Sequence, residues 1–112
     1  MKIAARHQDG VTILDLKGKI TIGVGDVALR EAVHEALDAG ARNILLNMKE
    51  VSTVDSSGIG EMVSTYTTVT NRGGKLKLVD LPSKVADVLQ ITQLITVFET
   101  FDDEQEAINS FS

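Results

Sequence analysis

Two adjacent serines follow an aspartate and precede two glycines in the stretch Asp-Ser-Ser-Gly-Ile-Gly at residues 55–60. A serine hydroxyl can carry a phosphoryl group, and the first N–H groups of a helix attract such an anion. A phosphoserine adds about -1.5 to -2 charges. We therefore expect a phosphate on Ser56 or Ser57 to leave the domain folded and to repel a partner with an acidic or apolar surface. The charge of Asp55 sharpens that contrast.

The same stretch predicts the start of a helix. One of Asp55, Ser56 and Ser57 is expected to cap it, because short polar side chains accept hydrogen bonds from the first helical N–H groups. Gly58 and Gly60 then fall in the first turn, where each costs about 1 kcal/mol relative to alanine. Two interpretations of these glycines remain open, namely tight packing on a sheet or a bare backbone where a partner docks.

The elements that position this stretch can be read from the spacing of apolar residues. Residues 2–7 and 11–18 predict a hairpin turned at Asp9-Gly10, a favoured two-residue turn. The further expected strands are residues 19–22, 43–48, 75–79 and 96–101, and the expected helices are residues 27–39, 59–69, a segment that begins with Pro82 in its first turn, and a C-terminal segment. Residues 43–48 lack alternation, which is typical of a strand covered on both faces.

The ends of the expected helices are marked by capping and breaking residues. Asp26 offers a cap, Gly40 a stop, and Gly73-Gly74 the end of the second helix. Asp102 followed by Gln105 resembles a capping box for the last helix. The order is β-β-β-α-β-α-β-α-β-α, and it predicts an α/β fold with a small mixed sheet and about four helices packed on it.

Composition excludes several classes of protein. The chain has 112 residues, of which 43% are apolar, as expected of one domain over residues 1–112. It has no cysteine, and its net charge of -5 and 4% aromatic content argue against nucleic-acid binding. No apolar run approaches the length of a membrane span, so we expect a cytoplasmic protein that does not insert into a membrane. His7 and His34 lack partners at metal-ligand spacing, so no metal site is expected.

Gly23, Gly25 and Ala28 form a G-x-G-x-x-A pattern, and Glu50 follows at the end of the next expected strand. The pattern formally matches a dinucleotide fingerprint. However, the chain holds only about half of a full dinucleotide fold, and the preceding strand is short and follows a hairpin. We therefore favour a flexible turn before a helix and expect no bound cofactor.

An enzyme is not expected. Ser56 lacks the glycine two residues before it that a G-x-S-x-G elbow needs, since Val54 stands there. No histidine base is aimed at the serine by any recognisable motif. The acidic residues 102–106 are more simply complements of a helix dipole than a cation site.

The segments Val51–Gly60, "VSTVDSSGIG", and Asn71–Leu94, "NRGGKLKLVDLPSKVADVLQITQL", resemble a STAS domain of the bacterial anti-sigma factor antagonist family. The resemblance runs across nearly the whole chain and implies a STAS-type fold. It also implies that Ser56 is phosphorylated by a partner anti-sigma factor, itself a serine kinase that supplies ATP and Mg²⁺. The unmodified protein would bind that kinase and free the sigma factor, and a PP2C-type phosphatase would reverse the modification.

By the same resemblance, Asp55, Ser56, Ser57, Gly58, Gly60 and Thr21 would contact the partner. Thr21 stands where the family often has an aspartate, in a loop that contacts the kinase, and this difference bears on which partner is recognised. Glu61 stands where an apolar residue is common. A monomer is the simplest expectation. The alternative is a STAS scaffold subunit of a signalling complex or lipid transporter that works without phosphorylation.

Overall fold

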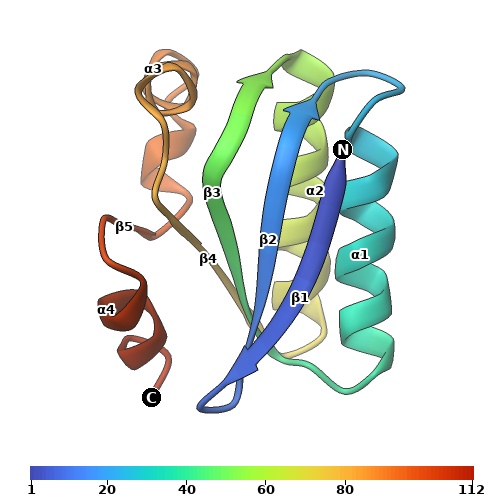
Figure 1. The fold of residues 1–112 in the computed structure, drawn as a ribbon, viewed down its shortest axis with the longest axis vertical. Coiled ribbons are helices and arrows are strands. Elements are labelled where there is room, and N and C mark those ends of the chain that lie inside the picture. The colour runs from blue at the N-terminus through green and yellow to red at the C-terminus, as the bar shows by residue number, and fades with distance from the viewer.

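The computed structural model describes residues 1–112, which form one five-stranded sheet with the strand order β1-β2-β3-β4-β5 (Figure 1). β1 pairs with β2 in the antiparallel sense, and the other neighbours are parallel. The strands are β1 Lys2–Gln8, β2 Val11–Ile20, β3 Asn43–Val54, β4 Lys75–Val79 and β5 Thr100–Phe101. The helices are α1 Asp26–Asp38, α2 Ser56–Asn71, α3 Ser83–Ile91 and α4 Glu104–Asn109, with a 3₁₀ turn η1 at Leu94–Thr96. The expected mixed α/β sheet with four helices is confirmed.

The hairpin between β1 and β2 turns at the expected residues. Asp9 and Gly10 have φ angles of 53° and 78°. Two consecutive positive φ values match the twist of a tight hairpin, and a short polar residue followed by glycine tolerates them best.

Three strands differ in extent from the expectation. Residues 19–20 are the end of β2 and not a separate third strand, because β2 continues through register shifts on either side of Gly18. Such an irregularity bends a strand without ending it. β3 runs on to Val54, since its polar second half still pairs with β2. β5 is limited to Thr100–Phe101, because η1 occupies residues 94–96 and the chain turns and bends at residues 97–98.

Helix boundaries shift by one residue at three places. The cap of α4 is Asp103, whose carboxylate accepts a hydrogen bond from the Glu106 N–H at 3.0 Å, and not Asp102. Asp26 is the first helical residue of α1, after Gly25 at the cap position. Pro82 occupies the cap position of α3 and so precedes its first turn.

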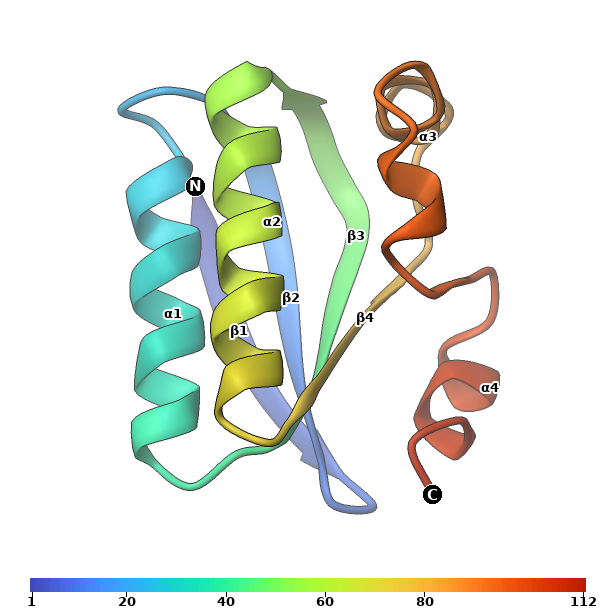
Figure 2. The same ribbon diagram turned by 180° about the vertical axis from the view of Figure 1, so that it is seen from behind.

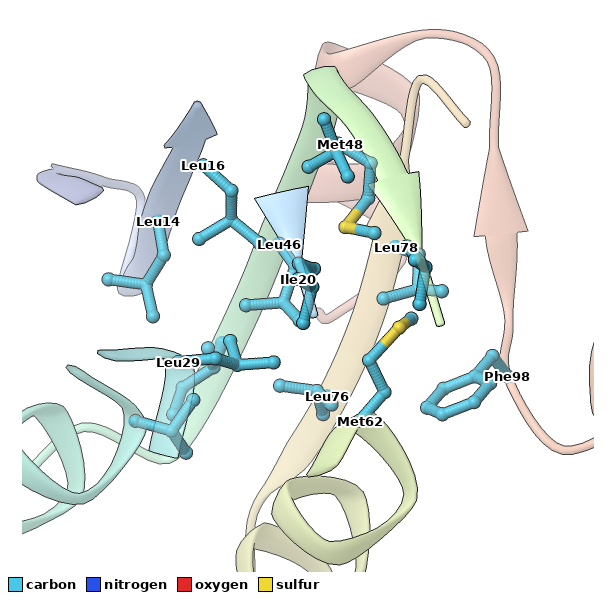
Figure 3. Packing of buried hydrophobic residues seen from close by; sticks show 14 of the residues in the cluster. Leu14, Leu16, Ile20, Leu29, Leu46, Met48, Met62, Leu76, Leu78 and Phe98 are labelled. Atoms are coloured by element: carbon cyan, nitrogen blue, oxygen red, sulfur yellow. The ribbon is translucent and has the colours of Figure 1, made fainter. Parts of the chain in front are cut away.

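Two hydrophobic cores lie on opposite faces of the sheet. Figure 2 shows α1 and α2 side by side across one face. The larger core fills the space beneath them and includes Leu14, Leu46, Met62 and Phe98, which Figure 3 draws from close by. The smaller core lies under α4 and is formed by Val11, Ile13, Leu45, Val79, Ala107, Ile108 and Phe111. β3 contributes to both cores, as the unbroken apolar run at its start predicts.

A buried lysine holds the C-terminal segment on the sheet. Lys77 of β4 is only 5% exposed. Its Nζ donates to the carbonyl and hydroxyl oxygens of Ser110, each at 3.0 Å, and lies 4.7 Å from the centre of the Phe111 ring. Glu99 supplies the opposite charge at 3.1 Å. These contacts satisfy a cation that burial would otherwise disfavour.

An ion-pair network joins α4 to the other edge of the sheet. Arg6 of β1 donates to both carboxylate oxygens of Asp15, at 2.6 and 2.8 Å, and also pairs with Glu104 at the start of α4. Asn47 donates to the same Glu104 carboxylate at 3.2 Å. These hydrogen bonds, those from Arg6 first, hold the pKa of Glu104 below its usual value.

Candidate functional site

The N-terminus of α2 is capped by Asp55, which also holds the β2–α1 loop. One carboxylate oxygen accepts a hydrogen bond from the Gly58 N–H at 2.8 Å. The other accepts from the Ile22 N–H at 3.1 Å. The Asp55 N–H donates to the carbonyl of Ile20 at 3.3 Å. The bond from Gly58, followed by that from Ile22, lowers the pKa of Asp55. Of the three candidate caps, Asp55 is therefore the one that the helix uses.

The two serines differ in accessibility. Ser56 is the first residue of α2 and is exposed, whereas Ser57 is half-buried. Ser56 therefore lies at the positive end of the helix dipole, beside the carboxylate that caps it.

The two glycines of the first turn of α2 have different surroundings. A Cβ on Gly58 would collide with the backbone carbonyl oxygen of Ile20, so the close approach of α2 to the end of β2 requires glycine there. A Cβ on Gly60 would meet no atom within 4 Å, and Gly60 is exposed. Packing therefore explains Gly58 and does not explain Gly60.

The β2–α1 loop is closed by its own hydrogen bonds. The carbonyl of Thr21 accepts from the N–H groups of Val24 and Gly25 at 3.0 and 3.1 Å. The Asp26 carboxylate accepts from the N–H of Gly23 at 3.0 Å and from that of Val27 at 2.8 Å. Amides of this loop are thus already bonded, and a carboxylate lies where a pyrophosphate would have to bind.

Other parts of the proposed fingerprint have structural explanations. A Cβ on Gly25 would collide with the carbonyl oxygen of Lys19, so packing accounts for this glycine. Glu50 lies opposite Lys17 in the register between β3 and β2. It stands inside β3, which continues to Val54, and not at the end of that strand. The geometry therefore favours a turn before a helix over a dinucleotide site.

Two exposed apolar side chains lie in the β2–α1 loop at this end of the molecule. Ile22 is 71% exposed and Val24 is 51% exposed, both in the loop that Asp55 holds. We call the set Thr21, Ile22, Val24, Asp55, Ser56 and Gly60 the docking surface. The sequence analysis missed Ile22 and Val24, although two large apolar residues within a glycine-rich turn are a signal of a binding surface.

Glu61, one turn into α2, faces α1. Its side chain is 13% exposed, and Arg30 Nε lies 3.8 Å from its Oε1 atom. That oxygen has no hydrogen-bond partner. Glu61 therefore lies between α1 and α2 as a weakly paired carboxylate. Unlike Ser56, it is largely shielded from solvent.

The remaining candidate ligands do not converge. His7 and His34 are both exposed, one on β1 and one on α1. No group of three or more His, Cys, Asp or Glu side chains is placed to hold a metal ion. None of the helices combines the length and the apolar character needed to cross a membrane.

The chain is similar to known proteins over most of its length. The family model described as "STAS domain" matches residues 2–107. The anti-sigma F factor antagonist of Paenibacillus polymyxa is 27% identical over 109 residues, which cover 96% of this chain and 92% of that protein.

Solved structures share the fold. A Thermotoga maritima protein described as a candidate anti-sigma factor antagonist superposes with a TM-score of 0.89 at 25% identity, over 97% of this chain and 93% of that one. The Bacillus cell fate determinant SpoIIAA in its phosphorylated form gives a TM-score of 0.74 at 20% identity, over 99% of this chain and 100% of that one. Since the family model covers nearly the whole chain, the protein belongs to the STAS domain family.

Proposed function

We propose that this protein is an anti-sigma factor antagonist that binds an anti-sigma factor serine kinase through the docking surface while Ser56 is unmodified. Phosphorylation of Ser56 by that kinase ends the complex, and a PP2C-type phosphatase restores it. The protein is a substrate and a binding partner in this cycle, and not itself an enzyme.

The observation that carries the proposal is the position of Ser56. It is an exposed hydroxyl at the first residue of α2, next to a loop with two exposed apolar side chains. Gly60 adds a stretch of bare helix backbone that packing does not require. Support also comes from the P. polymyxa relative, which is named as an antagonist of anti-sigma F factor, and from SpoIIAA, whose fold has been solved in a phosphorylated form.

The electrostatics explain how one group can reverse binding without unfolding the domain. A phosphate on Ser56 lies at the end of α2 where the helix dipole stabilises negative charge. The Asp55 carboxylate already binds the Gly58 and Ile22 N–H groups, so it need not move. A partner that covers Ile22 and Val24 would have to desolvate the new dianion beside an existing carboxylate. The domain tolerates this charge, whereas the interface does not.

Affinity capture from the extract of the native cell tests the proposal. Wild-type protein is immobilised, and extract is passed over it with and without ATP. We expect a serine kinase of the anti-sigma type to be retained without ATP and released with ATP, with phosphate on Ser56 by site-resolved mass spectrometry. Ser56→Ala should retain the kinase in both conditions, and Ser56→Glu in neither.

Two further results decide between the alternatives. Ser57→Ala should behave as wild type. If Ser57→Ala were not phosphorylated while Ser56→Ala still were, the phosphorylated residue would be Ser57. Retention of partners by wild type, Ser56→Ala and Ser56→Glu alike, with no phosphorylated form in cells, would support a scaffold that works without phosphorylation and would reject the switch.

A further inference from the structure

The helices leave half of one sheet face uncovered. The core under α4 includes Val11 and Ile13 at the start of β2. By strand alternation, Lys17 and Lys19 lie on the same face further along β2, and both are exposed. Figure 1 shows no helix in front of this half of β1, β2 and β3, whereas α4 lies at the lower left. The second half of β2 therefore presents this face to solvent.

β3 adds polar side chains to the uncovered face through two register shifts. Met48, Val51 and Val54 belong to the larger core on the opposite face. Between them stand two pairs of exposed residues, 49–50 and 52–53, where regular alternation would leave a single exposed residue each time. Each register shift therefore adds one side chain to the uncovered face, as a β-bulge does.

Four lysines from three neighbouring strands gather on this face. We call them the basic face: Lys2, Lys17, Lys19 and Lys49. Lys2 lies directly opposite Lys17 in the register of β1 and β2, and both line one shallow hollow. Like charges directly opposite each other destabilise a sheet. None of the four lysines makes an ion pair, so nothing within the chain offsets this repulsion.

Acidic groups on the same face neutralise it only in part. Asp15 is held by Arg6, which also pairs with Glu104. Glu50 lies opposite Lys17 in the register of β2 and β3 and makes no ion pair. The basic face thus keeps an excess of positive charge, although the net charge of the chain is -5.

The basic face continues into the docking surface. Lys19 stands two residues before Thr21, and its register partner Thr53 stands two residues before Asp55. Thr21 and Asp55 both belong to the docking surface. Because a strand rises about 3.3 Å per residue, Lys17 lies only about 13 Å from Thr21 along the chain. A protein interface of ordinary size spans both surfaces.

We propose that the basic face binds an acidic segment of the partner that occupies the docking surface. The inference rests on the proposed function, because it names the chemistry of the same partner. The lysines attract the acidic segment and speed its association, as complementary charges at the rim of an interface do. A phosphate on Ser56 adds negative charge at the border of the two surfaces and opposes the same acidic partner.

Other anionic partners fit the face less well. β1, β2 and β3 contain no Phe, Tyr or Trp on which a nucleic-acid base could stack. None of the large exposed apolar side chains lies on the face, so it offers a lipid layer nothing to bury. An acidic protein segment needs neither feature.

Protein-observed NMR titration tests the inference without the kinase. The probes are a short peptide of alternating glutamate and serine and a matched peptide of alternating lysine and serine. The glutamate peptide should shift the amide signals of residues 17–19 and 49–53, and the lysine peptide should not. Absence of these shifts, or equal shifts with both peptides, would overturn the inference.

A matched pair of double variants locates the site. Lys17→Gln with Lys19→Gln should weaken binding of the glutamate peptide about fivefold. Lys75→Gln with Lys84→Gln removes the same charge from two exposed lysines elsewhere and should leave the affinity unchanged. All four positions are exposed, so both proteins should keep the Tm of wild type. Equal losses of affinity in the two variants would show general charge attraction and reject the basic face as a site.

Association kinetics with the captured kinase separate this inference from the proposed function. Lys17→Gln with Lys19→Gln should slow association at least about threefold, reduce its dependence on salt and change dissociation little. Association as fast as that of wild type would overturn the inference and leave the proposed function intact. If wild type retains no kinase, the proposed function fails, and the peptide titration alone decides the inference.

A short DNA duplex and vesicles of phosphatidylglycerol complete the test. Each should shift the signals of residues 17–19 less than the glutamate peptide does at the same concentration of negative charge. Tighter binding of the duplex would assign the basic face to nucleic acid, and tighter binding of the vesicles would assign it to a membrane. Either result would reject the acidic protein segment.

Discussion

Asp55 and Ile22 are separated by 33 residues, and the Asp55 carboxylate accepts a hydrogen bond from the Ile22 N–H at 3.1 Å. The same carboxylate caps α2 through Gly58. One side chain therefore fixes the apolar loop relative to the exposed Ser56. We therefore expect the spacing between the two halves of the docking surface to change when Asp55 is replaced by a residue without an acceptor.

Replacing Asp55 tests this double role. Asp55→Ala should lower the Tm, because it removes the cap, and should accelerate hydrogen exchange at the Ile22 amide. Asp55→Asn retains an acceptor oxygen and should lie between Asp55→Ala and wild type in both measurements. Exchange at Ile22 that is as slow in Asp55→Ala as in wild type would show that the loop is held by other contacts.

The two glycines of α2 should respond oppositely to alanine. Gly58→Ala places a methyl group against the Ile20 carbonyl and should destabilise the protein by about 1–3 kcal/mol. Gly60→Ala meets open space and should stabilise it by up to about 1 kcal/mol. Urea denaturation measures both changes.

If the docking surface includes Gly60, then Gly60→Ala should also weaken kinase capture despite the gain in stability. Capture that is unaffected by this variant would remove Gly60 from the interface and leave its role unexplained.

Ile22 offers a test of binding that is separate from folding. Because its side chain is 71% exposed, Ile22→Ser should change the free energy of unfolding by no more than about 0.5 kcal/mol. The variant should lose most kinase retention, since a buried interface would lose an apolar anchor. Ile91→Ser, at an 82% exposed site on α3, is the matched control and should retain the kinase.

Acid sensitivity should depend on the Arg6–Glu104 pair. Arg6 lowers the folded-state pKa of Glu104 from its ordinary value of 4.5, so the ionised carboxylate stabilises the fold above that value. This contribution is lost as the pH falls through the lowered pKa. The lowered pKa of Asp55 acts in the same direction and persists in Arg6 variants.

Arg6→Gln should therefore show a shallower fall in unfolding free energy between about pH 5 and pH 2 than wild type does. Lys2→Gln removes a cation from the same strand that makes no ion pair, and should retain the wild-type slope. Identical slopes for all three proteins would show that Arg6 does not lower the pKa of Glu104 in solution.

Removal of the buried lysine should release α4. Lys77→Ala loses two hydrogen bonds to Ser110 and the contact with Phe111, and should cost about 3 kcal/mol. Amides of α4 should exchange faster with solvent. Lys75→Ala, at the exposed start of the same strand, should change stability by less than about 0.5 kcal/mol.

Local signals predict the fold well where neighbours in sequence decide the structure. Asp9-Gly10 gives the hairpin turn, and residues 75–79 match β4 at both ends. Gly18 leads to the wrong prediction of a separate third strand. The sequence alone does not distinguish a bulge within one strand from the boundary between two strands. Asp102 and Asp103 are both good caps, and the competition between them is decided by how α4 docks on the sheet.

The candidate site is predicted less completely. The sequence places Asp55, Ser56 and the two glycines at a helix start, which the structure confirms. The sequence cannot distinguish the role of Gly58 from that of Gly60. Only Gly58 lies against the carbonyl of Ile20, which belongs to β2 and is distant in the chain. The hydrogen bond from Ile22 to Asp55 is equally hidden, since it joins segments far apart in the chain.

The placement of the two chain ends decides how the protein can be handled. Met1 approaches Gly18 near the far end of β2, beside the loop that leads to α1, whereas Phe111 packs with Val11 at the opposite end of that strand (Figure 1). A surface tether attached after Ser112 thus presents the Ser56 end to solvent, and one attached before Met1 crowds it. The protein should therefore be immobilised on sensor chips and resins through its C-terminal residue.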